Sequence, residues 1–245
     1  MCPLSIQLNF NDDYVCLKSG VSDGTGFKYQ IKQCRLLIQR VATLESFQMA
    51  FEAKLLKQPA QFVCDVFTCK SFIIPQNQRI FEVSDAFSVS FSPQKTIACL
   101  IDQNVSLGQL GTSVFNFKFF NLKDIFLTIN SFRDPNVSFR LDVSDDNTYI
   151  LRSWLDLFGN NSTWSTEGLI VDRIKYTKNY PFIPFSMLNL ETECPEMIHP
   201  KKLASVRIHL EFSADNPCLK LILFNKAVQT ITVDSQRACI KDFSF

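Results

Sequence analysis

Apolar and polar residues alternate along much of this chain, and that pattern predicts β-strands with one buried face. In SVRIHLEF, residues 205–212, the two kinds alternate at every position. Turn-forming groups such as SPQ, NSFRDPN and SADNPC separate such runs. Other runs rich in β-branched and aromatic residues are QFVCDVFTCKSFII, AFSVSF, KTIACLIDQ, KDIFLTI, LKLILF and QTITVD. The pattern predicts about a dozen strands packed in layers, which is an all-β domain.

The segment TLESFQMAFEAKLLKQPA breaks the alternation, because its apolar residues recur three and four positions apart. Thr43 is the expected N-cap and Pro59 the stop, so we expect a linking helix over residues 43–58. Residues 1–42 hold only two or three strands, in IQLNFNDDYVCL and KYQIKQCRLLIQRV, whereas residues 61–245 hold enough to close a core. The chain is therefore expected to contain the tail of one sheet domain, a linking helix and a complete second domain.

A second segment with helical spacing lies between later strands. DDNTYILRSWLDLFG offers Asp146 or Asn147 as a cap, and it places Ile150 and Trp154 four residues apart. Gly159 occupies the position at which helices commonly stop. The sequence therefore predicts a short helix inserted in the second domain.

Composition and charge narrow the classes of partner. The 25 Lys and Arg residues balance 24 Asp and Glu residues, so no strong field is available to hold a polyanion, and we expect no direct nucleic-acid binding. The beginning of the chain lacks the pattern of a secretory signal, and the apolar runs are too short to span a membrane. We therefore expect a protein that is not secreted and has no membrane partner.

The nine cysteines are scattered, without a CxxC pair, and the closest two are Cys64 and Cys69. This usage is typical of reduced, packed thiols rather than of a disulfide or zinc framework. The compartment that fits is intracellular, the cytoplasm or the nucleus.

Residues with catalytic or metal-binding chemistry are few. His199 and His209 are the two histidines, and neither has a Cys, Asp or His at metal-ligand spacing, so both are interpreted as ordinary polar residues. Asp145 and Asp146 are interpreted as helix-capping residues rather than a cation site. The sequence contains no HExxH and no Gly-rich phosphate loop. We expect no catalytic, cofactor or metal site, and no enzymatic activity.

Four of the chain's 24 phenylalanines lie in VFNFKFFNL, residues 114–122. Alternation would place Phe115, Phe117 and Phe119 on one face of a strand. A core strand, a subunit interface and a ligand groove each use such a run, and a strand buried mainly on one side accounts for most of it.

The order of these segments resembles the C-terminal half of the double jelly-roll major capsid proteins of Polinton (Maverick) elements and adintovirus-like relatives. The series runs through SPQKTIACLIDQN, VFNFKFFNL, YILRSWLDLF, YPFIPFSMLNL and VRIHLEF to ITVDSQRACI, and the resemblance covers about residues 6–240. It implies an all-β jelly-roll sandwich of two antiparallel sheets, with one linking helix and one short inserted helix.

Individual positions are similar to the family's motifs. VFNFKFFNL looks like its Asn-Pro-Phe-Asn-Phe block, with Ser113 and Val114 in place of the Asn-Pro. ITVDSQRACI looks like its closing Ile-Glu-Ile-Asp followed by a basic residue. The positions that the resemblance marks are Pro93, Asp102, Phe115, Asn116, Phe117, Trp154, Phe185, Asp234 and Arg237.

The resemblance implies a capsid-type structural protein, a subunit of a viral or virus-derived shell that is located in the virion or capsid. Intact relatives form trimeric capsomers and contact other capsid proteins. In them a whole jelly roll precedes the linking helix, so residues 1–42 are expected to be the terminal strands of a truncated first jelly roll. The chain is then expected to be a truncated or domesticated copy.

The alternative hypothesis is a host jelly-roll binding module without enzymatic activity. Such a module places convergent polar or metal-binding residues on inward-facing strand positions. The sequence shows no such cluster, which favours the capsid-type role.

Overall fold

A computed structural model of the chain describes residues 6–18, 28–39, 41–84, 86, 95–108, 111–129, 131–141, 148–159, 171–186 and 206–241. The strands in these ranges are β1 (Ala60–Ile74), β2 (Ile80–Val83), β3 (Lys95–Asp102), β4 (Leu122–Ile129), β5 (Phe132–Arg140), β6 (Ile183–Ser186), β7 (Val206–Phe212), β8 (Leu219–Val233) and β9 (Cys239–Lys241). The helices are α1 (Asp13–Cys16), α2 (Glu45–Lys57), α3 (Gln103–Ser106), α4 (Thr148–Gly159) and α5 (Arg173–Asn179).

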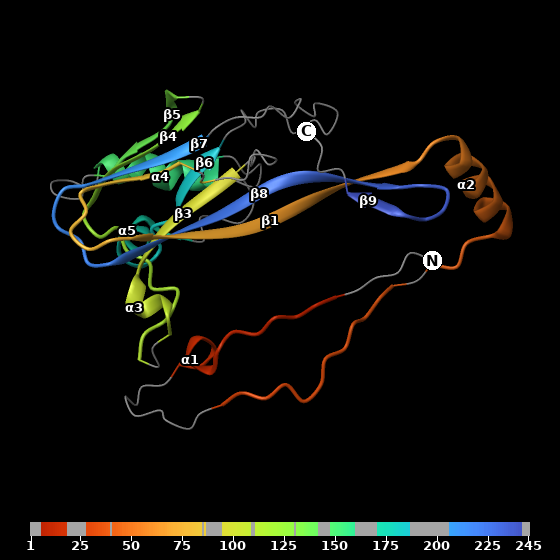
Figure 1. Cartoon of the computed structure of the whole chain (residues 1–245), viewed down its shortest axis with the longest axis horizontal. Helices are drawn as coiled ribbons and strands as arrows, with labels where there is room; N and C mark the ends of the chain where they lie inside the picture. The colour runs from red at the N-terminus through yellow and green to blue at the C-terminus, as the bar shows by residue number, and fades with distance from the viewer. Residues whose placement is uncertain are drawn as a thin grey trace.

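The described strands form a jelly-roll sandwich of two antiparallel sheets (Figure 1). One sheet has the order β1-β8-β3-β6, with β9 paired to β8, and the other has the order β2-β7-β4-β5. The pairs are nested, since β1 pairs with β8, β2 with β7, β3 with β6 and β4 with β5. This pairing results when a long antiparallel hairpin is rolled up, and it defines a jelly roll. The predicted fold class is therefore confirmed.

The main core lies between the two sheets. Alternate residues of β7 are buried, as the sequence pattern predicts. Phe185 of β6 is fully buried, and its ring meets that of Phe139 edge to face, with 5.4 Å between centroids. Near one end of this core, the buried hydroxyl of Thr96 in β3 donates a 2.9 Å hydrogen bond to the side-chain oxygen of Asn225 in β8.

Beyond that polar pair, β1 and β8 continue as an arm, which we define as residues 60–66 and 227–233. β3 pairs with β8 only as far as Lys226, and β9 pairs with it only from Ile231 to Val233. Between these points, β1 and β8 have only each other as partners among the described strands. Figure 1 shows the arm reaching from the sandwich toward α2.

The stretch VFNFKFFNL is not a strand, so this prediction is wrong. Residues 111–121 form a largely irregular loop, and β4 begins at Leu122. Positive φ angles of 49° at Phe120 and 60° at Asn121 turn the chain just before β4. The apolar residues recur here because the loop contacts two separate cores, and not because it is extended.

The group NSFRDPN is not a long turn, which corrects a second prediction. Ile129 pairs with Phe132, and Ser131 adopts a φ of 71° between them, so the turn is tight and β5 begins at Phe132. Pro135 lies within β5. A proline is tolerated there because β5 is an edge strand, and because Pro135 lies at a register shift between the pairs Thr128–Arg133 and Phe126–Ser138.

The two strands expected before the linking helix are not formed within residues 6–18 and 28–39. Asp13–Cys16 is a helical turn instead, and the rest of these ranges is irregular. Tyr29 joins them, because its amide donates to Asp13 Oδ1 at 3.3 Å and its hydroxyl donates to the Asn11 carbonyl at 2.6 Å. Alternation gives a strand only where a partner supplies backbone hydrogen bonds, and no ladder partner lies beside these ranges among the described strands.

Both predicted helices are present. α2 begins one residue later than expected, with Leu44 as N-cap in place of Thr43, whose hydroxyl accepts a hydrogen bond from Gln48 at 3.1 Å. α4 ends at Gly159, as predicted, whereas its expected caps at positions 146 and 147 lie outside the described residues. The helices α1, α3 and α5 were not predicted. Most of AFSVSF also lies outside the described residues.

Candidate interaction surface

The positions marked by the family resemblance do not converge on one site. Pro93 lies outside the described residues. Phe185 belongs to the main core. Asp102 ends β3, where its Oδ1 accepts a 2.8 Å hydrogen bond from the Asn104 amide and caps α3. Trp154 is half-buried in α4, and its indole donates to the Val171 carbonyl at 3.0 Å. These residues hold the fold together.

Phe115, Asn116 and Phe117 form a tight turn in the loop before β4. The Asn116 amide donates to the Ser113 carbonyl at 3.0 Å, and the Phe117 amide donates to the Phe115 carbonyl at 2.9 Å. As a result the two rings have opposite environments, since Phe115 is 66% exposed and Phe117 is 3% exposed. Phe117 belongs to a small second core on the outer face of β3, with Cys99 and Ile101.

Asp234 and Arg237 are brought together in the turn that joins β8 to β9. Asp234 Oδ1 accepts a 2.8 Å hydrogen bond from the Ala238 amide, and Arg237 adopts a φ of 62° to close the turn. The Arg237 guanidinium then reaches Glu52 of α2 at 3.0 Å. The turn therefore attaches the end of the arm to the linking helix.

The helix α2 is attached but hardly buried. Leu55 is its one buried residue. Phe47 and Phe51 stack on each other with centroids 6.5 Å apart, yet they are 60% and 46% exposed. A hollow between the helix and the β8–β9 turn is lined by Thr43, Phe47, Gln48, Phe51, Glu52 and Arg237. Of the apolar residues that recur three and four positions apart, Leu44, Phe47 and Phe51 are therefore exposed and Leu55 is buried.

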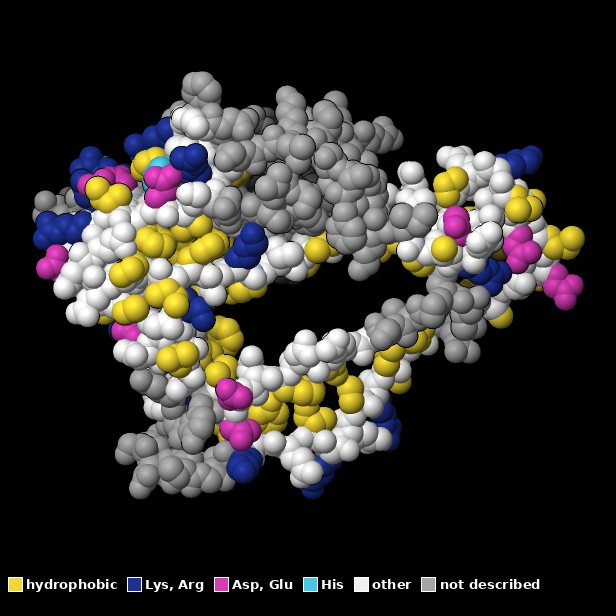
Figure 2. Space-filling view, viewed as in Figure 1, with side chains coloured by type: hydrophobic (Ala, Val, Ile, Leu, Met, Phe, Trp, Pro, Cys, Tyr) yellow, Lys and Arg dark blue, Asp and Glu magenta, His cyan; other side chains and the backbone are white. Residues whose placement is uncertain are grey.

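Exposed apolar side chains concentrate in the first part of the chain, and we call these residues together the apolar end. Among the described residues, 24 large apolar side chains are exposed, and 16 of them lie between positions 6 and 67. They are Ile6, Leu8, Phe10, Ile31, Leu36, Leu37, Ile38, Val41, Leu44, Phe47, Met49, Phe51, Leu56, Phe62, Val63 and Phe67. Figure 2 shows apolar side chains along the N-terminal segment and around α2. A soluble domain rarely exposes so much apolar surface unless the surface binds something.

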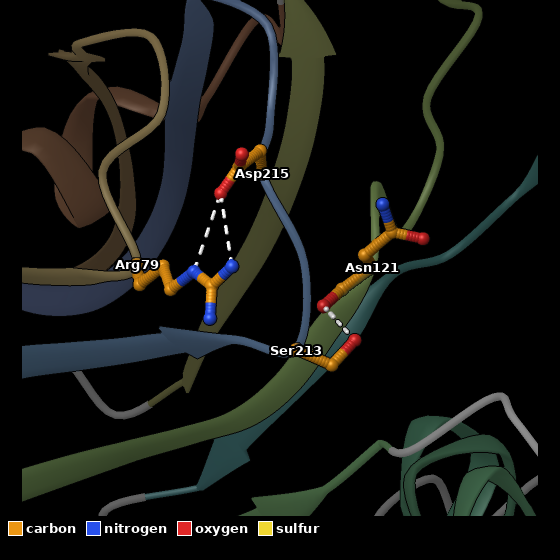
Figure 3. A network of polar contacts seen from close by, with 4 residues as sticks. All are labelled: Arg79, Asn121, Ser213 and Asp215. Carbon is orange, nitrogen blue, oxygen red and sulfur yellow. Dashed lines mark hydrogen bonds and ion pairs between the residues drawn. The ribbon is translucent and has the colours of Figure 1, made fainter.

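The far end of the sandwich is closed by polar contacts that sequence reasoning missed (Figure 3). Arg79 donates from two nitrogens to Asp215 Oδ1, each at 3.2 Å. The Ser213 hydroxyl donates to the Asn121 carbonyl at 3.2 Å. Partners 136 and 92 residues apart leave no local signal in the sequence. The contacts fasten the loops at this end, in contrast to the uncovered arm at the other.

His209 lies on the outer face of the second sheet, and the interpretation as an ordinary hydrogen-bonded residue agrees with its contacts. Its ring stacks on Phe126 with centroids 4.7 Å apart, and its nitrogens lie 3.2 Å from Thr128 Oγ1 and 3.5 Å from Glu82 Oε2. His199 lies outside the described residues.

Burial, more than any charged neighbour, shifts the pKa values of the most enclosed groups. It raises the pKa of the Cys99 thiol on the outer face of β3 and of the Tyr176 phenol in α5. The Tyr176 hydroxyl lies 2.6 Å from Ser153 Oγ and donates to the Phe182 carbonyl at 3.0 Å. Both groups are thus held neutral by packing.

Within the described ranges, no group of three or more His, Cys, Asp or Glu side chains is arranged to hold a metal ion. The helices in those ranges include none with the length and apolar character needed to cross a membrane.

Comparisons with known proteins find likenesses among solved structures, six chains in all. No family model and no curated protein matches the chain. The chain is similar to a chain of the Sputnik virophage in a structure determined by cryo-EM at 3.5 Å resolution, with a TM-score of 0.32 and 12% sequence identity. The match covers 75% of this chain and 38% of that chain, so this chain spans well under half of the virophage chain. A likeness this slight carries no argument about function.

Proposed function

We propose that the chain is a capsid-type structural protein that associates with copies of itself, and with other shell proteins, to build a viral or virus-derived shell. The observation that carries the proposal is the apolar end, whose 16 large apolar side chains lie exposed along the N-terminal segment, α2 and β1, beside a well-packed sandwich. The sequence resemblance to double jelly-roll capsid proteins supports the same role. The location would then be the virion or capsid, and the family's trimeric capsomer is the expected unit.

The size of the apolar end decides what kind of partner it needs. Burying the exposed half of a large apolar side chain contributes about 1 kcal/mol, so 16 such side chains contribute on the order of 15 kcal/mol. Bringing two proteins together costs about 4–15 kcal/mol in lost freedom. Covering most of the apolar end therefore favours stable association, whereas covering a few residues does not. A protein-sized neighbour fits this requirement better than a small ligand.

Mass measurement and electron microscopy test the proposal. We expect the purified chain to form trimers or larger species in multi-angle light scattering, and closed or sheet-like particles in negative stain. Leu37→Ser combined with Phe47→Ser, both on the apolar end, should reduce association. Ile80→Ser combined with Ile174→Ser is the matched control, because these side chains are comparably exposed but lie elsewhere.

A strictly monomeric, well-folded protein at high micromolar concentration would refute the proposal. Monomeric protein with a clear positive on a glycan array would favour the alternative, a jelly-roll binding module.

A further inference from the structure

The first strand of the sandwich has an unusually long free edge. β1 is 15 residues long, lies at the edge of its sheet, and pairs with β8 alone among the described strands. Its register with β8 is continuous from Ala60 to Ile74, without a bulge. Figure 1 shows β1 running along the border of the sheet. Within the described part of the chain, no strand occupies the outer backbone groups of β1.

The other edges of the molecule are protected in the ways that natural sheets use. β2 and β6 are four residues long, and β9 is three residues long. β5 is longer but contains Pro135. Short length and proline both prevent an edge from pairing with another chain. β1 has neither protection, because Pro59 and Pro75 stand just outside its two ends.

The side chains of β1 do not repel a partner either. Its ionic residues are Asp65 and Lys70, and Asp65 is already neutralised by Lys226 at 2.9 Å. Phe62, Val63 and Phe67 are 52%, 58% and 73% exposed. A long and apolar edge with an unbroken register is a site for strand pairing.

We propose that β1 pairs antiparallel with β1 of a second copy of this chain, across a two-fold axis at Phe67. This inference deepens the proposed function, on which it rests, by naming one contact between copies. A two-fold axis normal to a sheet keeps each face on its own side, and the ladder is longest when the middle residue of the strand meets its own copy. Phe67 is the middle residue of Ala60–Ile74, and it is the most exposed apolar residue of the strand.

The register that this axis dictates is self-complementary. Phe67 lies opposite Phe67 of the second copy, and Phe62 lies opposite its Phe72, which gives aromatic cross-strand pairs. Asp65 and Lys70 lie opposite cysteines, at positions 69 and 64 of the second copy, so no like charges meet. The flanking prolines oppose each other and end the ladder. All 15 residues of β1 thereby gain a partner.

A matched pair of charge substitutions tests the pairing by sedimentation equilibrium of the full chain. Phe67→Lys places two positive charges face to face at the axis, and we expect the dissociation constant of the dimer to rise at least about tenfold. Ile174→Lys makes the same chemical change at a side chain that is 67% exposed on α5, and it should leave the dimer unchanged.

A cross-linking experiment tests the register itself. In a Cys64→Ser, Cys69→Ser background, Phe67→Cys should give a covalent dimer under mild oxidation, because directly opposite residues lie within disulfide reach. Val63→Cys in the same background should not, since its own copy would lie eight residues away along the ladder, about 27 Å.

Equal cross-linking of the two cysteine variants, or a dimer that survives Phe67→Lys as well as Ile174→Lys, overturns the edge pairing. A monomer in which the β1 amides that point away from β8 are protected from hydrogen exchange also overturns it, because the chain's own N-terminal segment would then cover the edge. Shell particles that form despite Phe67→Lys would refute the edge pairing and leave the proposed function standing. A Phe67-dependent dimer that never builds larger particles would support the edge pairing and refute the proposed function.

Discussion

Phe115 and Phe117 allow the effect of one substitution to be compared at two neighbouring positions, because both are phenylalanines and lie two residues apart. As a strand, the stretch would place both rings on one face, and alanine substitutions would have similar effects. In the structure the turn at Asn116 separates them, so that Phe117 is 3% exposed and Phe115 is 66% exposed. We therefore expect Phe117→Ala to destabilise the fold strongly and Phe115→Ala to have little effect.

The magnitude follows from the surroundings of Phe117. Its ring meets that of Phe182 edge to face at 5.7 Å and packs against Cys99 and Ile101 on β3. Removing a buried phenylalanine ring costs about 3–5 kcal/mol in free energy of unfolding. Phe115 keeps only an edge contact to Phe117, with 6.4 Å between centroids, so its removal should cost less than about 1 kcal/mol.

Equilibrium urea unfolding, followed by tryptophan fluorescence, measures both variants. Trp154 packs against the main core, so its emission reports on the sandwich. In thermal unfolding, a domain of this size loses about 2–4 °C in melting temperature per kcal/mol, so the melting temperature of Phe117→Ala should fall by roughly 6–20 °C. Equal losses in the two variants would refute the turn and restore the strand. Equally small losses would mean that the second core does not contribute to stability.

Three further predictions follow from the buried and turn-forming residues. Burial raises the pKa of Cys99 and Tyr176, so their contribution to stability is complete below their ordinary pKa values and is lost as the pH rises toward the raised pKa values. The urea midpoint should therefore be constant up to about pH 9 and fall above it. Cys99→Ala should make this fall in the urea midpoint smaller near pH 9. Tyr176→Phe leaves the part-buried Phe182 carbonyl without its donor and should cost about 1–3 kcal/mol in free energy of unfolding, whereas Tyr180→Phe, at a position 41% exposed, should change it by less than about 0.5 kcal/mol. Asp234→Ala removes the acceptor for the Ala238 amide and should cost about 0.5–1.5 kcal/mol in free energy of unfolding. The β9 amides of this variant should exchange faster than those of the Ser235→Ala control. Equal exchange rates in the two variants would contradict the role of the turn.

Sequence periodicity predicted strands wherever one face of the strand meets the core and the other meets solvent. β7 is the clearest case, because its buried and exposed residues alternate along its length. β5 was missed, because Asn, Asp and Pro within it are typical of turns, and its edge position and register shift allow them. VFNFKFFNL was assigned to the wrong element, because residues that fill two different cores can reproduce the period of a strand.

The candidate surface was harder to predict than the fold. Apolar residues in the first part of the chain, such as Leu36, Leu37 and Ile38, could be noticed from the sequence, but their exposure could not. The resemblance marked Asp234 and Arg237, whereas the contact of Arg237 with Glu52 joins residues 185 positions apart. Such a partner depends on how the arm and the helix are placed, which local sequence does not encode.

The arm has a mechanical consequence. Its strands remain in register for seven residue pairs beyond Phe67 and Lys226, so it extends by about 20 Å as a single twisted ribbon. Two-stranded ribbons twist more strongly than broad sheets, and their twist is set by the backbone rather than by loop side chains. The length of the ribbon therefore fixes the distance between the sandwich and α2, and its twist fixes the angle between them. In an assembly, that angle would set the curvature of the wall.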